Sequence, residues 1–214
     1  MSGEHYFTSR PSSAGEPRSL QVTLAGRPVT VHTAKGVFSP DRVDTGTAVL
    51  LGQAPPPPPA GALLDLGCGW GPLALTLALR SPAADVYAVD VNERALDLVR
   101  RNAAALGLDR VQASRPDQVP EGLRFATIWS NPPIRIGKAG LHELLRTWLP
   151  RLEPDGTAYL VVQKNLGADS LRRWIAGELG MPCQRLASSR GFRVLAVRWP
   201  DHPPFSTSST GSDR

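Results

Sequence analysis

The sequence predicts an α/β domain whose sheet is mainly parallel and is covered by helices on both faces. Strand-like and helix-like patterns alternate from residue 62 to residue 179, as expected for parallel strands joined by crossover helices. Two consecutive strand patterns follow at 183–187 and 192–199 and predict an antiparallel pair at one sheet edge. A length of 214 residues, 41% of them apolar, suits one such domain with additions.

The residues ahead of this domain predict a β-hairpin and a short helix. Apolar and polar residues alternate at 20–24 and again at 29–32, with the turn-like segment AGRP between them. A short apolar helix over 48–51 is expected to open at the segment DTGT, residues 44–47. The five prolines at 55–59 cannot continue that helix and predict a stiff, extended spacer.

The domain itself shows short apolar runs and one clear helical repeat. The runs predict strands at 62–66, 85–90, around Val111, 125–129 and 157–162. Helices are expected at 73–79, 93–106, 141–149 and 170–179. We therefore divide the chain into an N-terminal extension (1–54), a polyproline linker (55–60), the α/β domain (61–199) and a disordered tail (200–214) rich in Ser, Thr and Pro.

Composition and charge exclude several classes of protein. No apolar run reaches the ~18–20 residues of a membrane helix, and the first residues lack the apolar centre of a secretory signal. Because Cys68 and Cys183 are the only cysteines, we expect a cytoplasmic protein without a disulfide framework or a bound metal. The net charge is +5, and the whole basic excess lies in residues 131–214, which permits a polyanionic partner.

A glycine-rich cluster, LDLGCGWG at 64–71, lies where the first strand of the domain meets its first helix. Glycine allows positive φ and a close approach of the backbone to a ligand. Asp65 precedes the first glycine, and Asp90 ends the next strand, where a carboxylate can accept both hydroxyls of a ribose. Pro72 stands where the dinucleotide pattern needs its third glycine, which disfavours pyrophosphate binding. The structural alternative is a tight turn that closes the strand–helix–strand unit.

A second cluster, SNPPIRIGK at 130–138, follows the strand that ends at Trp129. Its two prolines stiffen the backbone and remove two N–H groups. The side-chain oxygen of Asn131 and the backbone carbonyl of Pro132 can then act as two acceptors for the N–H groups of an exocyclic amine. Held in this way, the amine can aim its lone pair at an electrophile. An ordinary Asn-Pro turn is the structural alternative.

These motifs resemble those of class I S-adenosylmethionine-dependent methyltransferases. More narrowly, the chain resembles the methyltransferase small-domain group, which contains the ribosomal small-subunit RNA guanine-N2 methyltransferases. The resemblance spans about residues 5–198 and implies a Rossmann-like, seven-stranded methyltransferase sheet with an N-terminal β-hairpin extension. Besides the two clusters it includes HYF at 5–7, GVFS at 36–39, VDTGT at 43–47, VDVN at 89–92, QK at 163–164 and GFRVL at 191–195.

The resemblance implies that S-adenosylmethionine is the cofactor and assigns a part of it to each motif. Asp65, Gly67, Gly69 and Gly71 would contact the methionine part. Asp90 would accept from the ribose hydroxyls, and Val91 would pack on the adenine. Phe38 and Asp44 would belong to an N-terminal cover over the cofactor and the target. Asn131 and Pro132 would be the catalytic residues that hold the target amine. Pro133 and Ile134 would stack on the target base.

One segment departs from the pattern of the family. After the third strand of the domain, members often carry an acid that accepts a hydrogen bond from the adenine amino group. Here Arg115 falls at that position, and an arginine side chain cannot accept a hydrogen bond. We therefore expect Asp117 to take this role, with packing by Val91 alone as the alternative.

The expected function is methyl transfer to an exocyclic nitrogen of a nucleic-acid base, with guanine N2 in ribosomal RNA or a ribosomal particle as the preferred target. Arg135, Lys138 and Lys164 are the candidates for contacts to RNA phosphates. Three alternatives remain: transfer to a protein glutamine amide, transfer to a small molecule, and a non-enzymatic RNA-binding assembly factor.

Overall fold

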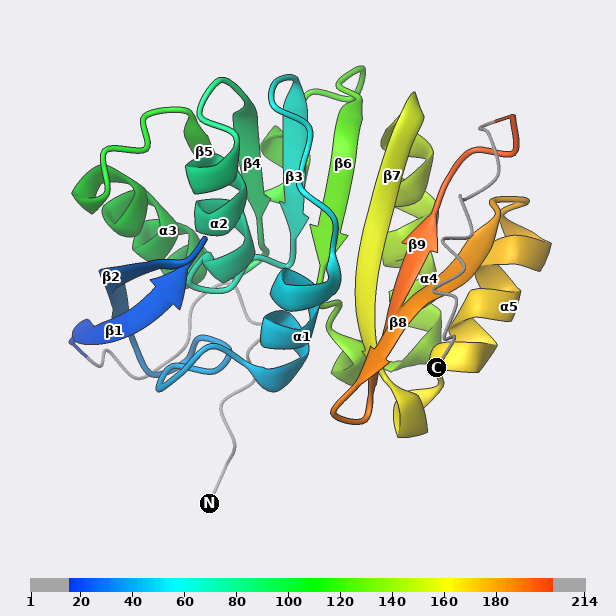
Figure 1. Cartoon of the computed structure of the whole chain (residues 1–214), viewed down its shortest axis with the longest axis horizontal. Coiled ribbons are helices and arrows are strands. Elements are labelled where there is room, and N and C mark those ends of the chain that lie inside the picture. Colours follow the sequence, from blue (N-terminus) through cyan, green and yellow to red (C-terminus); the bar gives the residue numbers. More distant parts are fainter. Residues whose placement is uncertain (1–15, 202–214) are drawn as a thin grey trace, which may run out of the picture.

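The computed structural model describes residues 16–201, which form a seven-stranded sheet with helices on both faces and a separate two-stranded hairpin (Figure 1). The seven strands lie in the order β5-β4-β3-β6-β7-β9-β8. The predicted α/β fold with an N-terminal hairpin is thereby confirmed. The motif at 5–7 and all but the first two residues of the tail predicted at 200–214 lie outside the described residues.

Five strands of the sheet run parallel to one another. They are β3 (Ala62–Leu66), β4 (Asp85–Val89), β5 (Val111–Ser114), β6 (Phe125–Ser130) and β7 (Leu152–Gln163). From β3 the chain builds outward to β5, then returns to place β6 on the other side of β3. The order in which the chain adds strands therefore reverses between β3 and β6. Ligands of open α/β sheets bind at such a point, outside the carboxyl ends of the strands.

The last two strands, β8 (Cys183–Ser189) and β9 (Phe192–Val197), are antiparallel, as predicted. β9 lies between β8 and β7 and runs antiparallel to both. This arrangement places the start of β9 beside the end of β7, where Gln163 is opposite Phe192. Both residues therefore lie at the same sheet edge as the ends of the parallel strands.

Helices cover both faces of the sheet (Figure 1). One face packs against α1 (Thr45–Gln53), α2 (Pro72–Arg80) and α3 (Glu93–Ala105), and the other against α4 (Gly137–Trp148) and α5 (Ala168–Glu178). Each helix packs on the sheet through an apolar face. On α3 this face contains the buried residues Ala95, Leu96 and Val99, and on α4 it contains Leu141 and Leu145. Four short 3-10 turns complete the elements: η1 (Pro116–Gln118), η2 (Ile134–Ile136), η3 (Leu149–Arg151) and η4 (Lys164–Leu166).

Two elements, α4 and β7, begin about four or five residues earlier than the sequence predicts, the largest shifts among the predicted starts. α4 begins at Gly137 instead of residue 141, because the second cluster turns through η2 directly into the helix. Gly137 and Gly140 are poor helix formers, so the sequence does not predict the first turn of this helix. β7 begins at Leu152 instead of residue 157, because the segment EPDG at 153–156 carries turn-type residues inside a strand.

The hairpin consists of β1 (Arg18–Leu24) and β2 (Arg27–Thr33). Ala25 and Gly26 connect the strands with φ of 50° and 77°, as a two-residue hairpin turn requires. The buried Asn102 of α3 fixes the hairpin to the domain, because its Nδ2 donates to the carbonyl oxygens of His32 (2.9 Å) and Trp70 (3.1 Å). The hairpin is thus hydrogen-bonded to α3 by the same side chain that holds the glycine-rich cluster.

Residues 16–201 contain neither a helix that could span a membrane nor a cluster of metal-binding side chains. None of the helices there combines the length and the apolar character that a bilayer crossing demands. The same residues contain no group of three or more His, Cys, Asp or Glu side chains arranged to hold a metal ion.

Candidate active site

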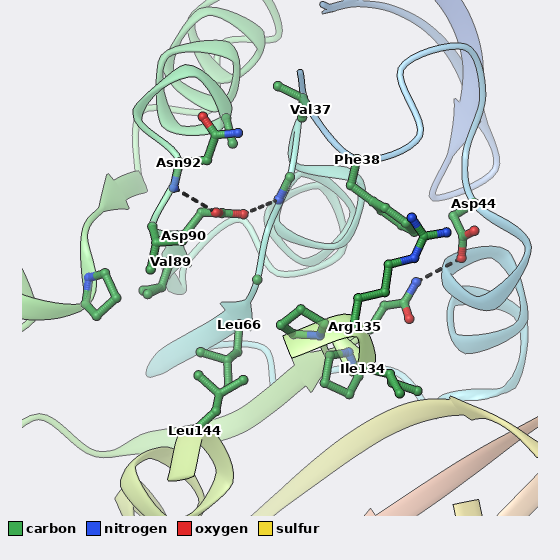
Figure 2. A pocket seen from close by; sticks show the side chains of 18 of the residues that line it. Val37, Phe38, Asp44, Leu66, Val89, Asp90, Asn92, Ile134, Arg135 and Leu144 are labelled. Atoms are coloured by element: carbon green, nitrogen blue, oxygen red, sulfur yellow. Dashed lines mark hydrogen bonds between the residues drawn. The ribbon is translucent and has the colours of Figure 1, made fainter. Parts of the chain in front are cut away.

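A cavity of about 300 Å³ opens at the carboxyl ends of the parallel strands, at the point where the strand order reverses (Figure 2). Figure 2 shows Asp90 on one side of it and Phe38, Asp44 and Arg135 on the other. Other lining residues come from both motif clusters, from the end of β7 and from the start of β9. Segments distant in sequence therefore surround one space.

The glycine-rich cluster forms a tight turn under this cavity. The N–H groups of Gly67 and Cys68 both donate to the carbonyl oxygen of Val89, at 2.8 and 3.0 Å. Gly67 and Gly69 have φ of 78° and 55°, a region that other residues rarely adopt. The turn thus connects the ends of β3 and β4 and exposes backbone to the cavity.

Asp90 lies at the end of β4 with its carboxylate fixed by backbone donors. Its Oδ2 accepts from the N–H of Gly69 at 2.9 Å, and its Oδ1 accepts from the N–H of Asn92 at 3.0 Å (Figure 2). Burial raises the pKa of this carboxyl above its ordinary value. The N–H of Val91 also acts on this carboxylate, and since an ionised carboxylate offers about four acceptor positions, it can still accept from a hydroxyl group in the cavity.

Asp65 is fully buried beneath the turn. Its Oδ2 accepts from the N–H of Ala74 at 2.8 Å, whereas its Oδ1 has no hydrogen-bond partner among the described residues. Burial raises the pKa of this carboxyl to about 8. A smaller hollow beside the main cavity is lined by Asp65, Gly67, Asp44 and Asn131. Because buried polar atoms are nearly always paired, the free oxygen indicates a place for a donor group.

Asn131, directly after β6, has its carboxamide held in one orientation. Its Nδ2 donates to Asp44 Oδ2 at 2.8 Å and to Thr47 Oγ1 at 3.1 Å. A carboxylate can only accept, so the amide nitrogen must face Asp44. The side-chain oxygen of Asn131 is therefore left as an acceptor beside the cavity that this residue lines.

Asp44 is held in turn by the helix that follows it. As the N-cap of α1, its Oδ2 accepts from the N–H groups of Gly46 (2.8 Å) and Thr47 (3.2 Å). Gly46 has no room for a side chain, since a Cβ there would lie 2.9 Å from the ring of Phe192. The N-terminal segment thus positions the residue that orients Asn131.

The rest of the second cluster lies along the same wall. Pro132 is buried, Pro133 and Ile134 are half-buried, and all three line the cavity. Ser130 anchors the cluster from beneath, because its Oγ donates to the Leu66 carbonyl oxygen at 2.7 Å. Arg135 lines the cavity with an exposed side chain. The apolar side chains of this wall suit the face of a planar ring.

Five of the predicted site residues do not line the main cavity, and one of them, Asp65, lines the smaller hollow beside it. Gly71 packs instead between α2 and α3, where a Cβ would lie 3.0 Å from Val99 Cγ2. Lys138 and Lys164 are exposed at the same edge of the sheet, outside the cavity. Asp117 also lies outside the cavity, with a side chain that is 75% exposed.

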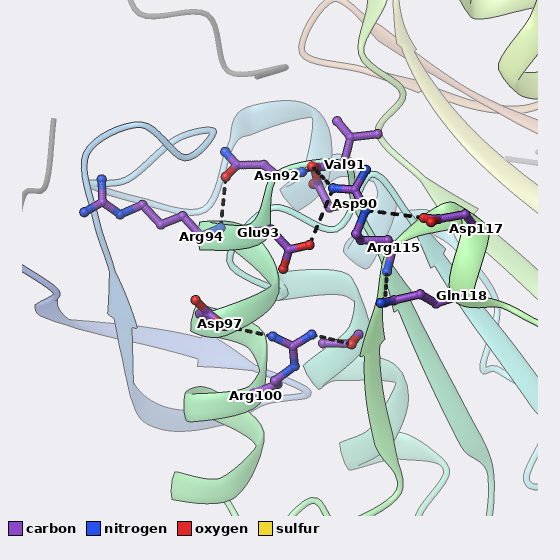
Figure 3. A network of polar contacts seen from close by, with 11 residues as sticks. Asp90, Val91, Asn92, Glu93, Arg94, Asp97, Arg100, Arg115, Asp117 and Gln118 are labelled. Atoms are coloured by element: carbon purple, nitrogen blue, oxygen red, sulfur yellow. Dashed lines mark hydrogen bonds and ion pairs between the residues drawn. The ribbon is translucent and has the colours of Figure 1, made fainter. Parts of the chain in front are cut away.

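Asp117 takes part in a polar network around Arg115 (Figure 3). The Asp117 carboxylate lies 3.3 Å from Arg115 Nε, and the guanidinium also donates to the Val91 carbonyl oxygen at 3.2 Å. Glu93 lies 3.5 Å from the same guanidinium. Arg115 therefore holds the backbone of Val91, whose side chain lines the cavity together with Pro116.

Several lining residues had no role in the sequence predictions. Gln163, Leu166 and Phe192 form the wall contributed by β7, η4 and β9, and Leu144 of α4 lies beneath it. The only signal for Gln163 and Phe192 was their place in motifs shared with the family. Leu144 and Leu166 carried no signal, because an apolar residue of a helix or turn is ordinarily assigned to packing.

Comparisons with known proteins agree with this geometry. The family model "Methyltransferase small domain" matches residues 28–196. The uncharacterized protein YbxB of Bacillus subtilis is 35% identical over 170 residues, covering 78% of this chain and 85% of its own. Ribosomal RNA small subunit methyltransferase C of Pseudomonas aeruginosa is 38% identical over 181 residues, covering 82% of this chain and 52% of its own.

A solved structure shows the same fold. The 16S rRNA N2 G1207 methyltransferase RsmC of T. thermophilus, in complex with AdoMet and guanosine, has a TM-score of 0.73 and 25% identity, covering 89% of this chain and 52% of that one. The chain thus spans about half the length of the rRNA methyltransferases that it matches. By its match over residues 28–196, the chain belongs to the methyltransferase small domain family.

Proposed function

We propose that the chain transfers a methyl group from S-adenosylmethionine to the exocyclic N2 of a guanine in ribosomal RNA. The observation that carries this proposal is the fixed carboxamide of Asn131, which presents an oxygen beside the cavity while its nitrogen is held by Asp44 and Thr47. An amine donor is the group that such an acceptor recognises. The named relatives that act on small-subunit rRNA support the choice of RNA.

The residues around the cavity fit the cofactor. The unpaired buried oxygen of Asp65 suits the ammonium group in the methionine part of S-adenosylmethionine. The carboxylate of Asp90, held by the N–H groups of Gly69 and Asn92, suits the ribose hydroxyls. Val91 and Pro116 provide apolar surface for the adenine. When bound, S-adenosylmethionine supplies an electrophilic methyl group on a sulfonium. The chain's part is to hold the acceptor nitrogen in line with that group.

Asn131 and Pro132 do this by accepting hydrogen bonds. The Asn131 oxygen and the Pro132 carbonyl can each take one N–H of the guanine amine, which directs its lone pair away from them. Positive charge that develops on the nitrogen faces two oxygen dipoles already in place, and this preorganisation lowers the barrier. The proton leaves afterwards to water, so no basic side chain is needed. Ile134 and Pro133 would support the plane of the base.

The basic residues at the same edge favour RNA over a small acceptor. Arg135 at the cavity and Lys138 and Lys164 outside it are all exposed. They could contact phosphates on either side of a base that enters the cavity, and the base must leave its stack to do so. Since the chain covers about half of the rRNA methyltransferases it resembles, the choice of nucleotide belongs to the proposal.

Labelled methyl transfer tests the proposal directly. Small ribosomal subunits, naked rRNA, tRNA, protein extract and metabolites are offered side by side, and labelled nucleosides are identified by mass spectrometry. N2-methylguanosine from the subunits or rRNA is expected. Label confined to protein would indicate the glutamine alternative, and label confined to metabolites the small-molecule alternative.

Two controls complete the experiment. Asn131→Ala should abolish transfer while calorimetry still detects cofactor binding, because the acceptor group is lost and the cofactor contacts remain. A wild-type chain that binds no S-adenosylmethionine would instead indicate an assembly factor without methyltransferase activity.

A further inference from the structure

Gln163 is a polar residue of the cavity that the proposed reaction does not use. It is the last residue of β7, its side chain is exposed, and it lines the cavity. The side chain makes no hydrogen bond to any other part of residues 16–201, although a carboxamide carries two donors and an acceptor. A free amide at the wall of a binding cavity is available to a ligand.

Strand register places Gln163 beside Asn131. Ser130 of β6 is opposite Leu160 of the parallel strand β7. The next residue of each strand continues this register, so Asn131 is opposite Val161. Gln163 is two residues beyond Val161. Side chains two residues apart share a face of the sheet, and Trp129 and Val161 pack in the same core cluster. Asn131 and Gln163 therefore point to the same side, separated by about 7 Å along the strands and about 5 Å across them.

This spacing matches the edge of one purine. On guanine, the exocyclic N2 is followed along the same edge by N1–H, a donor, and by O6, an acceptor. With N2 held at Asn131 and Pro132, the Gln163 oxygen can accept from N1–H while its nitrogen donates to O6. On adenine the amine is followed by a single acceptor and then a C–H, so the same amide makes one hydrogen bond instead of two.

We propose that Gln163 is the specificity residue that selects guanine by this paired contact, an inference that rests on the proposed function. The surrounding wall is apolar at Ile134, Leu166 and Phe192, so a base bound between these side chains would limit the access of water to the contact. Gln163 is thereby distinct from Asn131, which holds the reacting nitrogen of any exocyclic amine.

The test compares two RNAs and two variants. The shortest RNA that the wild-type chain methylates is prepared with guanine or with 2-aminopurine at the target. 2-Aminopurine keeps the exocyclic amine but lacks both N1–H and O6. The variants are Gln163→Leu and, as a matched control, Asn165→Leu, which removes an exposed amide two residues away and outside the cavity.

Because N1 of 2-aminopurine can still accept from the Gln163 amide, the wild type should prefer the guanine RNA by roughly 10-fold in kcat/KM, the effect of one hydrogen bond. Gln163→Leu should remove this preference by lowering transfer to guanine more than transfer to 2-aminopurine, with cofactor affinity unchanged, and Asn165→Leu should resemble the wild type. Equal losses on both RNAs, or no loss on either, would overturn the role of Gln163. A wild-type chain that makes no N2-methylguanine from any RNA would instead refute the proposed function itself.

Discussion

Asp44 Oδ2 accepts a hydrogen bond from Asn131 Nδ2 at 2.8 Å, across 87 positions of sequence. The same oxygen caps α1 by accepting from the N–H groups of Gly46 and Thr47. These two hydrogen bonds fix its position beside Asn131. One carboxylate therefore begins a helix in the N-terminal extension and orients an amide in the α/β domain. The extension is in this way part of the candidate active site.

Asp44→Ser separates these two tasks. Serine is about as good an N-cap as aspartate, but its side chain is too short to reach Asn131. We expect normal thermal stability and a roughly 10- to 100-fold lower kcat, because the remaining partner, the Thr47 hydroxyl, can donate or accept and so does not fix which end of the Asn131 amide faces the cavity. Asp44→Ala should lose the same activity and about 1 kcal/mol of stability as well. Full activity of Asp44→Ser would show that Asn131 does not need Asp44 for its orientation.

The fold was predictable because its signals are local. The hairpin, the glycine-rich turn and the α3 helix each depend on residues within one short segment. The Asp44–Asn131 bond and the bonds of Asn102 to the hairpin were not predictable, because nothing in the sequence marks which distant polar groups will meet. Arg115 shows the same limit: its departure from the family pattern was visible, but its contact with the Val91 carbonyl was not.

Asp65 should make the stability of the free protein depend on pH. Its pKa is about 8 when folded against 3.8 in the unfolded chain, so the folded state retains a proton that the unfolded state releases. This contribution is complete below the unfolded pKa and is lost as pH rises through the folded pKa. Urea unfolding should show about 4 kcal/mol less stability at about pH 8 than at about pH 5, relative to Asp65→Asn. Equal pH dependence in the two proteins would contradict the raised pKa.

The Asp65 carboxyl should also release a proton when the cofactor binds. An ammonium beside the unpaired Oδ1 favours the charged carboxylate and lowers its pKa, so a proton leaves at neutral pH. Calorimetric binding enthalpies at pH 7 should then vary with the ionisation enthalpy of the buffer, and Asp65→Asn should remove that variation. A wild-type enthalpy that is independent of the buffer would place the ammonium elsewhere.

Asp117 lies outside the cavity with its carboxylate 3.3 Å from Arg115 Nε, so its side chain must turn toward the cavity to serve the adenine amino group. If it does so, Asp117→Ala should weaken cofactor binding by about 1.5–3 kcal/mol, the value of a hydrogen bond to a charged group. Glu121→Ala, which removes an exposed acid outside the cavity, is the control. An unchanged affinity of Asp117→Ala would leave the adenine to Val91 and Pro116.

Gly71 is predicted to serve helix packing. Its φ is 96°, and a Cβ would lie 3.0 Å from Val99 Cγ2, whereas Gly107 has a φ of 66° and open space around it. Gly107→Ala should therefore cost about 1 kcal/mol for backbone strain alone, and Gly71→Ala about 1–3 kcal/mol more.

Val99→Ala distinguishes packing from ligand contact at Gly71. In the double variant both methyl groups of Val99 are gone, Cγ2 included, so the additional cost of Gly71→Ala in urea unfolding should largely disappear. If Gly71 also lines the methionine part of the cofactor, as the family resemblance implies, Gly71→Ala should weaken cofactor binding and Val99→Ala should not restore it. Affinity that recovers together with stability would show that Gly71 acts on the cofactor only through the approach of α3 to α2.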